Sequence, residues 1–363
     1  MKIAVLYGGK SAEHEVSRVS AFYIARGLMK QHKIYLIGIT RDGLWYLQPD
    51  IVLEACRESE PPLELRTDAH RVLVEPGKGL IAVSNNNSII PLAIDAVFPV
   101  LHGTFGEDGT VQGLLACADL PYVGCDVYGS AIGMDKAYAK ILWMHAGLPV
   151  VPFLEIMAYE LPHETQKLIA AIEDSFQFPA IVKPSRAGSS VGIQKVNSKE
   201  VLPQALAHAA LFDTKLLVEP FLSVREIECS VIGNNTITSF PPGEIKAAHE
   251  FYDYDAKYID PNGAELIIPA HLTTEQASYI QDLAVQAYKA AGLTGLARVD
   301  FFIDIRTEKI MLNEVNTMPG FTSISMFPKM CGHGGLAYEA LLESLIQFAM
   351  DNYQQQKQMH YTR

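Results

Sequence analysis

The sequence of 363 residues has no excess of positive charge, no cysteine motif and only a short apolar run at its start. Its net charge of −12 gives no electrostatic basis for binding a nucleic-acid backbone or an anionic membrane surface. The five cysteines form no CxxC pair and are odd in number, which argues against a disulfide framework and a structural zinc site. We therefore expect small-molecule partners, not nucleic acid or membrane, and a reducing cytoplasm as the setting.

The apolar run nearest the N-terminus, residues 3–7, is too short for a signal-peptide core or a membrane span. We expect no export signal. Hydrophobic residues make up 49% of the sequence and charged residues 19%, a balance typical of folded domains. The length predicts two or three domains, and a cleft between domains is available as a site.

Strand and helix signals alternate at the start of the chain. Residues 3–7 and 33–39 are expected strands, separated by an amphipathic helix that Ser11 is placed to cap. This alternation predicts a doubly wound α/β domain over residues 1–125. Residues 50–90 are interrupted by turn residues, and we interpret them as an elaboration of that domain.

The rest of the chain predicts two further domains. Residues 126–222 contain a strand hairpin that encloses a glycine-rich loop. Residues 223–363 combine paired strands with helices, and the clearest helix, 273–291, begins with a capping box of Thr273 and Gln276. The fold class is therefore α/β, with α+β character in the C-terminal part.

The most informative pattern lies in two expected strands near the C-terminus. Because side chains alternate faces along a strand, Arg298 and Asp300 share one face, and so do Glu314 and Asn316. A hairpin turn between the strands would set Asp300 opposite Glu314, and Arg298 opposite Asn316. Two carboxylates and an amide oxygen suit Mg²⁺ beside nucleotide phosphates. The alternative is a solvated sheet face stabilised by arginine–carboxylate pairs.

A second pattern is the loop GSSVG at residues 188–192, which follows a strand that ends near Lys183. Backbone N–H groups and the hydroxyls of Ser189 and Ser190 could approach phosphate oxygens there, and Lys183 adds a positive charge. The alternative is a hairpin turn that binds nothing.

Taken in order, seven segments resemble the D-alanine–D-alanine ligases, a family of the ATP-grasp superfamily. They are GGKSAEHEVS at 8–17, LHGTFGEDGTVQG at 101–113, GMDK at 133–136, IVKPSRAGSSVGI at 181–193, FYDYDAKY at 251–258, ARVDFF at 297–302 and NEVNTMPGFTSISMFP at 313–328. The resemblance implies a two-domain ATP-grasp fold after the N-terminal domain. It also implies ATP-dependent ligation of two D-alanine molecules through an acyl phosphate, for peptidoglycan precursor synthesis.

The resemblance further implies Mg²⁺ as cofactor, with two ions and Mn²⁺ as a substitute, and a homodimer. The nucleotide-binding residues are Lys136, Lys183, Ser190, Glu219, Phe221, Leu222, Glu226 and Lys257. The substrate-binding residues are Glu13, His102, Arg298, Gly320, Ser325 and Met326. The catalytic residues are Glu13, Ser189, Tyr258, Arg298, Gly320 and Ser325. The metal ligands are Asp300, Glu314 and Asn316, in agreement with the strand-face argument.

Individual roles follow from the same resemblance. Glu13 would pair with the ammonium of the first D-alanine, and His102 would lie near its carboxylate. Tyr258 lies on a loop that closes over the site in the family and bonds to Ser189. By pattern alone, Glu13 could instead complement a helix dipole, and His102 could be a structural histidine.

Two alternative functions stay open. Within the same fold, the product could be D-alanyl-D-lactate or D-alanyl-D-serine, although the loop that ends in Tyr258 matches the D-alanine type. From another class, the chain could be a catalytically silent nucleotide-binding protein. The joint presence of the metal ligands with Lys183 and Arg298 argues against that second alternative.

Overall fold

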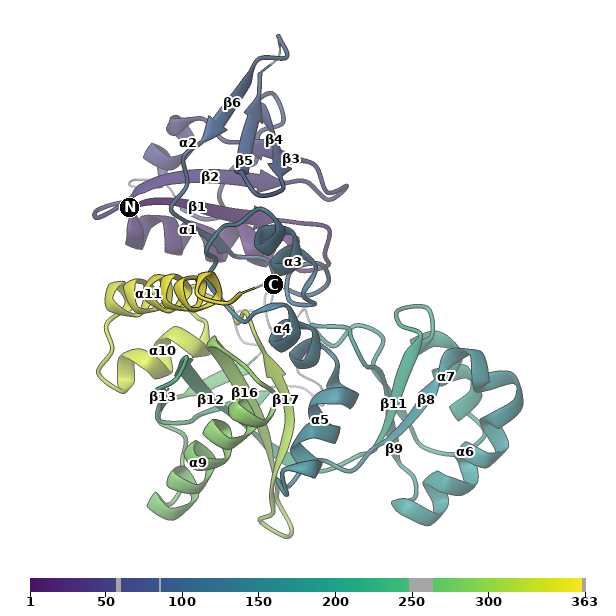
Figure 1. The fold of residues 1–363 in the computed structure, drawn as a ribbon. Helices are drawn as coiled ribbons and strands as arrows, with labels where there is room; N and C mark the ends of the chain where they lie inside the picture. The colour runs from purple at the N-terminus through teal and green to yellow at the C-terminus, as the bar shows by residue number, and fades with distance from the viewer. Residues whose placement is uncertain (57–59, 85, 248–263, 361–363) are drawn as a thin grey trace.

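The computed structural model describes residues 1–56, 60–84, 86–247 and 264–360, which form three β-sheets with their helices (Figure 1). The first sheet belongs to the N-terminal part, the second to the centre of the chain and the third to the C-terminal part. Within the described part of the chain, no helix combines the length and apolar character that a membrane span requires.

The first sheet has the strand order β6-β5-β4-β3-β2-β1-β7. β1 (Lys2–Gly8) lies between β2 (Lys33–Ile39) and β7 (Ala96–Pro99) and is parallel to both. Alternate residues of β1 pack against α1 (His14–Leu28) on one face and α3 (Thr110–Cys117) on the other. Helices on both faces of parallel strands are the expected doubly wound arrangement.

Residues 50–90 extend this sheet. They contain α2 (Asp50–Ala55) and the antiparallel strands β4 (His70–Glu75), β5 (Gly79–Val83) and β6 (Ile89–Leu92), which join β2 through β3 (Trp45–Leu47). The sequence indicated an elaboration of the first domain but not these strands. Most side chains of β4 and β6 are not buried, and these strands lack a regular alternation of apolar and polar residues that would mark a half-buried strand.

The first helix begins later than the sequence predicted, and Ser11 does not cap it. The Ser11 hydroxyl accepts a hydrogen bond from the N–H of Glu13 at 3.0 Å, in the turn before the helix starts at His14. Glu13 holds the N-cap position, and its side chain makes no capping hydrogen bond. The carboxylate of Glu13 therefore does not bind the free backbone N–H groups at the start of α1.

The second sheet has four antiparallel strands in the order β10-β9-β11-β8. They are β8 (Leu154–Met157), β9 (Ala180–Pro184), β10 (Gln194–Val196) and β11 (Lys215–Pro220). Helices α6 (Leu161–Ser175) and α7 (Leu202–Ala209) close a core that belongs to this sheet alone. β9 and β10 form the predicted hairpin around the glycine-rich loop.

The third sheet has the strand order β15-β14-β12-β16-β17, with β13 paired to β12, and its pairs are antiparallel. Its strands are β12 (Val224–Gly233), β13 (Ile237–Ser239), β14 (Gly243–Ala247), β15 (Ala264–Ile267), β16 (Gly295–Asp304) and β17 (Ile310–Asn316). α9 (Thr274–Ala290) covers one face, and its predicted capping box of Thr273 and Gln276 is confirmed.

Two helices connect the sheets. α4 (Val127–Met134) and α5 (Lys136–His145) lie in the range assigned to the central domain, yet they pack against β17. Trp143 of α5 is fully buried in the core of the third sheet. α5 therefore stands between the second and third sheets, as Figure 1 shows.

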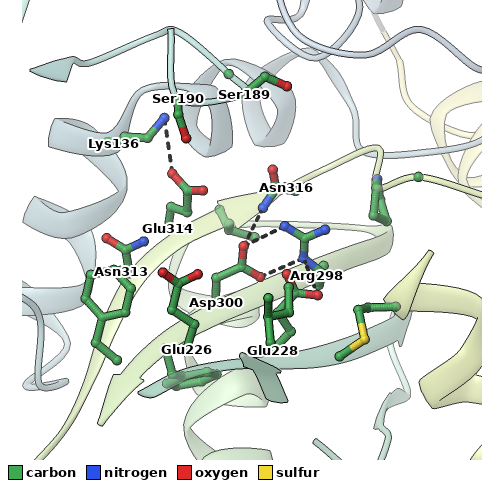
Figure 2. A pocket seen from close by; sticks show the side chains of 18 of the residues that line it. Lys136, Ser189, Ser190, Glu226, Glu228, Arg298, Asp300, Asn313, Glu314 and Asn316 are labelled. Carbon is green, nitrogen blue, oxygen red and sulfur yellow. Dashed lines mark hydrogen bonds and ion pairs between the residues drawn. The ribbon is translucent and has the colours of Figure 1, made fainter. Parts of the chain in front are cut away.

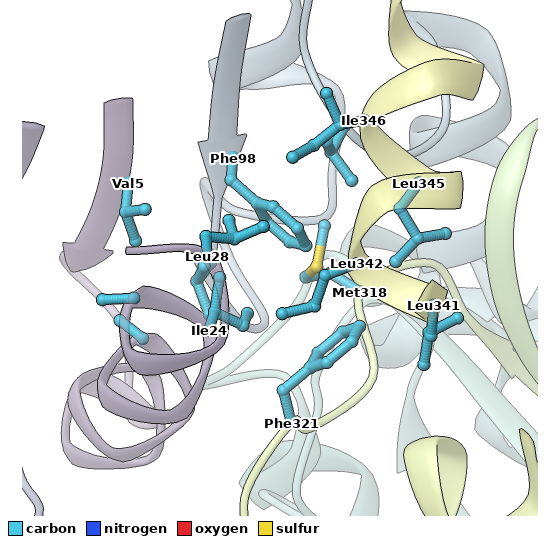
Figure 3. Close-up of a cluster of buried hydrophobic side chains, with 14 of the residues drawn as sticks. Val5, Ile24, Leu28, Phe98, Met318, Phe321, Leu341, Leu342, Leu345 and Ile346 are labelled. Carbon is cyan, nitrogen blue, oxygen red and sulfur yellow. The ribbon is translucent and has the colours of Figure 1, made fainter. Parts of the chain in front are cut away.

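The end of the chain joins the first and third sheets. α10 (Met326–His333) is a helix that the sequence did not predict. α11 (Tyr338–Lys357) inserts Leu341, Leu342 and Leu345 into one core with residues of α1, β7 and the third sheet (Figure 3). The N-terminal and C-terminal sheets thus share a core.

Candidate active site

One pocket collects side chains from the loops and strands of all three sheets. Lys257 and Tyr258 lie outside the described residues. Every other residue that the sequence assigned to the site lines this pocket: Glu13, His102, Lys136, Lys183, Ser189, Ser190, Glu219, Phe221, Leu222, Glu226, Arg298, Asp300, Glu314, Asn316, Gly320, Ser325 and Met326.

The predicted register of β16 and β17 is confirmed, with Arg298 opposite Asn316 and Asp300 opposite Glu314. Nε and Nη2 of Arg298 donate to the two Asp300 oxygens at 2.8 and 2.7 Å. Nδ2 of Asn316 donates to Asp300 Oδ2 at 2.9 Å, and Figure 2 shows the amide oxygen on the side away from Asp300. The four side chains lie together on one face of the sheet.

Glu228 on β12 is a charged member of this face that the sequence did not reveal. Its Oε2 lies 3.1 Å from Arg298 Nε, and its strand position is opposite Asp300. Burial opposes the charge of Arg298, but the carboxylates of Asp300 and Glu228 outweigh it and raise the pKa of the guanidinium well above its ordinary value. The alternation of Glu226 and Glu228 along β12 was the available signal.

Asn313 enters the pocket because the β16–β17 ladder is irregular. The register shifts after Asp300, so that Phe301 faces Leu312 and Asn313 is the additional residue. Its Oδ1 lies 3.5 Å from Nζ of Lys183 on the second sheet. A β-bulge re-aims a side chain in this way, and strict alternation cannot predict it.

The two carboxylates of this face suit a hard divalent cation, and Asn316 would add an amide oxygen once its amide turns away from Asp300 Oδ2. In the described ranges, no group of three or more His, Cys, Asp or Glu side chains is arranged to hold a metal ion. Two carboxylates are enough for Mg²⁺ where nucleotide phosphates and water supply further oxygens. Lys136 Nζ lies 3.3 Å from Glu314, and Arg298 pairs with Asp300. A bound cation would replace some of these lysine and arginine contacts.

The glycine-rich loop closes on Glu13. Ser189 donates its hydroxyl proton to Glu13 Oε1 at 2.6 Å. A Cβ added at Gly188 would lie 2.9 Å from Glu13 Oε2, and one added at Gly103 would lie 2.6 Å from the same atom. Ser189 and Ser190 have φ values of 50° and 59°, a left-handed conformation that costs a residue with a Cβ about 1 kcal/mol or more.

Lys136 and Lys183 line one side of the pocket. Lys136 Nζ donates to the carbonyl of Ala187 at 2.9 Å, and Lys183 Nζ lies 2.8 Å from Glu219 Oε2. The second oxygen of Glu219 lies 2.7 Å from Nζ of Lys140, which the sequence analysis missed. Lys140 follows Lys136 by four residues on α5, a spacing that places both on one helix face and was the available signal.

His102 is fully occupied by contacts within the protein. Its Nδ1 lies 2.8 Å from the Met318 carbonyl, and its Nε2 lies 3.1 Å from the Ser20 hydroxyl. Burial lowers the pKa of His102, so the ring is neutral at pH 7. These contacts support the alternative of a structural histidine, and a contact with substrate stays a prediction.

Glu107 is another site residue that the sequence analysis missed, although it stands in the matched segment 101–113. Its carboxylate accepts from the N–H of Gly103 at 3.0 Å and from the N–H of Met318 at 2.8 Å. It therefore joins the loop after β7 to the loop after β17. Burial, with the nearby Glu13 carboxylate, raises the pKa of Glu107 to about 7.

The far end of the pocket is the turn before α10. Ser325 holds the N-cap position of that helix, and its Oγ accepts from the N–H of Thr322 at 3.0 Å. A Cβ added at Gly320 would lie 2.7 Å from Ser325 Oγ, so the turn is tightly packed. The N-terminus of a helix favours a carboxylate nearby.

Comparison with known proteins shows the family. Two family models, described as D-ala D-ala ligase N-terminus and D-ala D-ala ligase C-terminus, match residues 2–125 and 142–347. The chain belongs to the D-alanine–D-alanine ligase family. Its fold is accordingly the predicted ATP-grasp fold, and membership of this ligase family implies the use of ATP and a divalent metal ion.

The similarity to individual ligases extends over nearly the whole chain. The D-alanine–D-alanine ligase of Treponema denticola is 49% identical over 100% of both chains, and that of Caldicellulosiruptor bescii is 45% identical over 100% of this chain and 99% of the relative. The structure of the D-alanine-D-alanine ligase from Coxiella burnetii has a TM-score of 0.82 at 33% identity and covers 98% of this chain and 97% of that one. The VanG D-Ala:D-Ser ligase from Enterococcus faecalis has a TM-score of 0.81 at 36% identity, with 96% and 99% covered.

Proposed function

We propose that this pocket joins two molecules of D-alanine to D-alanyl-D-alanine, with conversion of ATP to ADP and phosphate, in peptidoglycan precursor synthesis. The observation that carries the proposal is the 2.6 Å hydrogen bond from Ser189 to Glu13. It brings a loop suited to phosphate beside a carboxylate suited to an ammonium, and the two groups come from different domains.

In the first step, the carboxylate of one D-alanine attacks the γ-phosphate of ATP in line, the bond to the β–γ bridging oxygen breaks, ADP leaves, and an acyl phosphate forms. Glu13 binds the ammonium of this D-alanine. Lys136 and Lys183 stabilise the phosphate charge. Asp300, Glu314 and Asn316 would hold two Mg²⁺ ions, for which Mn²⁺ could substitute. The bound cations would supply further positive charge at the phosphoryl group.

In the second step, the other D-alanine attacks the acyl carbon as a neutral amine, the nitrogen then gives up a proton, and the bond to phosphate breaks as the amide forms. Arg298 and the N–H of Gly320 would stabilise the oxyanion of the tetrahedral intermediate, a role that the family resemblance implies for them. Ser325 and the N-terminus of α10 receive the carboxylate of this second substrate, and Met326 lies beside it.

The remaining roles rest on the family resemblance. Glu219 and Leu222 would meet the adenine, Phe221 would stack on it, and Glu226 would bind the ribose. Lys257 would reach the transferring phosphoryl group, and Tyr258 would close a lid that keeps water from the acyl phosphate. We also propose a cytoplasmic homodimer. Light scattering in solution would measure the oligomeric state.

The decisive experiment is ATP-dependent phosphate release with D-alanine as the only other substrate. Turnover with D-alanine and none with L-alanine supports the proposal, whereas absence of turnover with D-alanine would favour a catalytically silent nucleotide-binding protein. Separation of the products with D-serine or D-lactate added as acceptor tests the two alternative ligase activities. A dipeptide of D-alanine as the main product is the expected outcome.

A further inference from the structure

Lys140 of α5 is fully buried, although lysine is rarely found without solvent contact. Its Nζ lies 2.7 Å from Glu219 Oε1 and 3.3 Å from the Val151 carbonyl. Burial lowers the pKa of Lys140 to about 8, against the attraction of Glu219. Lys140 is not among the residues that line the pocket, so it acts through Glu219.

Glu219 is shared between two cations. Lys140 contacts one carboxylate oxygen, and Lys183 contacts the other at 2.8 Å. Burial opposes ionisation of Glu219, but the two lysines outweigh it and hold the pKa of this carboxyl below its usual range. Without Lys140, the Glu219 carboxylate, which is 3% exposed, would have to be neutralised by Lys183. Lys183 also lines the pocket.

We propose that Lys140 is a positioning residue that sets the preference for adenine over guanine by holding Glu219 ionised and oriented towards the base. The inference rests on the proposed function, in which Glu219 meets the adenine. Adenine carries an amine at C6, which donates to a carboxylate. Guanine carries a carbonyl oxygen there, which the carboxylate repels, so a fixed negative charge discriminates between the two bases.

The test compares ATP with GTP in wild type and Lys140→Met. Both nucleotides carry the same triphosphate, so any effect of the substitution on Lys183 or on metal binding cancels in the ratio of the two kcat/KM values. We expect this ratio to fall about tenfold or more, the worth of one charge-assisted hydrogen bond. The loss should appear in KM and in the dissociation constant for ATP, with kcat at saturating ATP largely kept.

Lys215→Met is the matched control. Lys215 forms an ion pair with Asp135 at 2.8 Å that is buried to a similar extent, and neither residue lines the pocket. We expect this variant to lose stability but to keep the wild-type ratio of kcat/KM with ATP to kcat/KM with GTP. Lys140→Arg, which retains the charge, should keep a ratio near that of wild type. Lys140→Gln replaces Lys140→Met if the latter does not fold.

An unchanged ratio in the uncharged Lys140 variants, or an equal fall of the ratio in Lys215→Met, would overturn the inference. Wild-type turnover with D-alanine and ATP keeps this outcome separate from the proposed function. If the wild type does not ligate D-alanine, the proposed function fails, and the ATP and GTP dissociation constants still decide the role of Lys140.

Discussion

Among single residues, Glu13 has one of the most tightly constrained positions in the pocket. Ser189 fixes one carboxylate oxygen, and the backbones at Gly103 and Gly188 leave no room for a side-chain carbon beside the other. Both glycines come from loops that also line the pocket. The orientation of Glu13 therefore depends on two loops as well as on its own backbone.

Glu13→Gln should weaken D-alanine binding at the first-substrate site about tenfold to a hundredfold while ATP binding stays near its wild-type value, because only the amino acid presents an ammonium to this group. Calorimetric titration of each ligand measures both affinities. Glu15→Gln is the matched control, because Glu15 is two residues away and pairs with Arg18 and Arg41. Equal losses for both ligands in Glu13→Gln would indicate a structural role.

Glu107 should make stability depend on pH between about 4.5 and 7. Its pKa rises from 4.5 in the unfolded chain to about 7 in the fold, so its contribution to stability is fully present below pH 4.5 and is lost as pH rises through 7. The change amounts to roughly 3 kcal/mol. Glu107→Gln removes this titration, and urea unfolding at pH 5 and 7.5 measures it. Parallel pH profiles for wild type and variant would contradict the assignment.

The residues that could be predicted without the family resemblance share one property, which is that they follow from spacing along one or two adjacent strands. Arg298, Asp300, Glu314 and Asn316 follow from alternation and a single hairpin. Glu228 lies opposite Asp300, but on β12, which comes much earlier in the chain, so its contact with Arg298 depends on long-range strand pairing. Such pairing is set by the whole sheet, and spacing alone does not give it.

At the level of elements, β16 carries two aspartates with different tasks. Asp300 faces Arg298 and Asn316 in the pocket, whereas Asp304 Oδ1 accepts from the N–H groups of Arg306 and Thr307 and fixes the turn into β17. The same aspartate-to-asparagine substitution can therefore be compared at two positions of one strand, Asp300 in the pocket and Asp304 at the turn of the hairpin.

Asp300→Asn should abolish detectable ligation and leave the unfolding midpoint within a few degrees of wild type, because it removes a charge that a divalent cation requires. Asp304→Asn should keep turnover and lower the thermal unfolding midpoint, since its turn loses charged hydrogen bonds. Phosphate release and thermal unfolding of the two variants measure this contrast. Near-wild-type turnover in Asp300→Asn at ordinary Mg²⁺ would rule out a metal role.

Elements with strong periodicity were predicted, and elements that depend on tertiary packing were not. The helix from Thr274 to Ala290 carries its own start signal in Thr273 and Gln276. α10 has eight residues and no side-chain cap, and its apolar residues Phe327 and Met330 pack into the core shared with α11. Short helices of this kind are stabilised mainly by packing, so local sequence gives them little signal.

At the level of the whole molecule, the three sheets do not form three independent folding units, because the first and third sheets share a core. Ile24 and Leu28 of α1 meet Leu342 of α11 in one core (Figure 3). The same core includes Phe327 of α10 and Leu296 of β16. The second sheet has a separate core. The first and third sheets should therefore unfold together. The second sheet can unfold on its own, because its core is separate.

Leu342→Ala tests this coupling. Leu342 is fully buried, and its Cδ1 would lie 2.7 Å from a Cβ added at Gly27, so α1 and α11 are in close contact there. The cavity should cost about 2 to 5 kcal/mol. Because the core is shared, we expect denaturant midpoints reported from the first and third sheets to fall by the same amount.

The two tryptophans provide the separate reports that this prediction needs. Trp45 packs on the first sheet and Trp143 lies in the core of the third, so Trp143→Phe and Trp45→Phe each leave one fluorescent probe. Leu342→Ala should shift both fluorescence transitions equally, whereas Ile172→Ala, in the separate core of the second sheet, should shift neither to that extent. A shift confined to Trp45 would show that the N-terminal sheet unfolds alone. The loops that hold Glu13 and Glu107 would then depend on their own domain, and not on the shared core, for their place in the pocket.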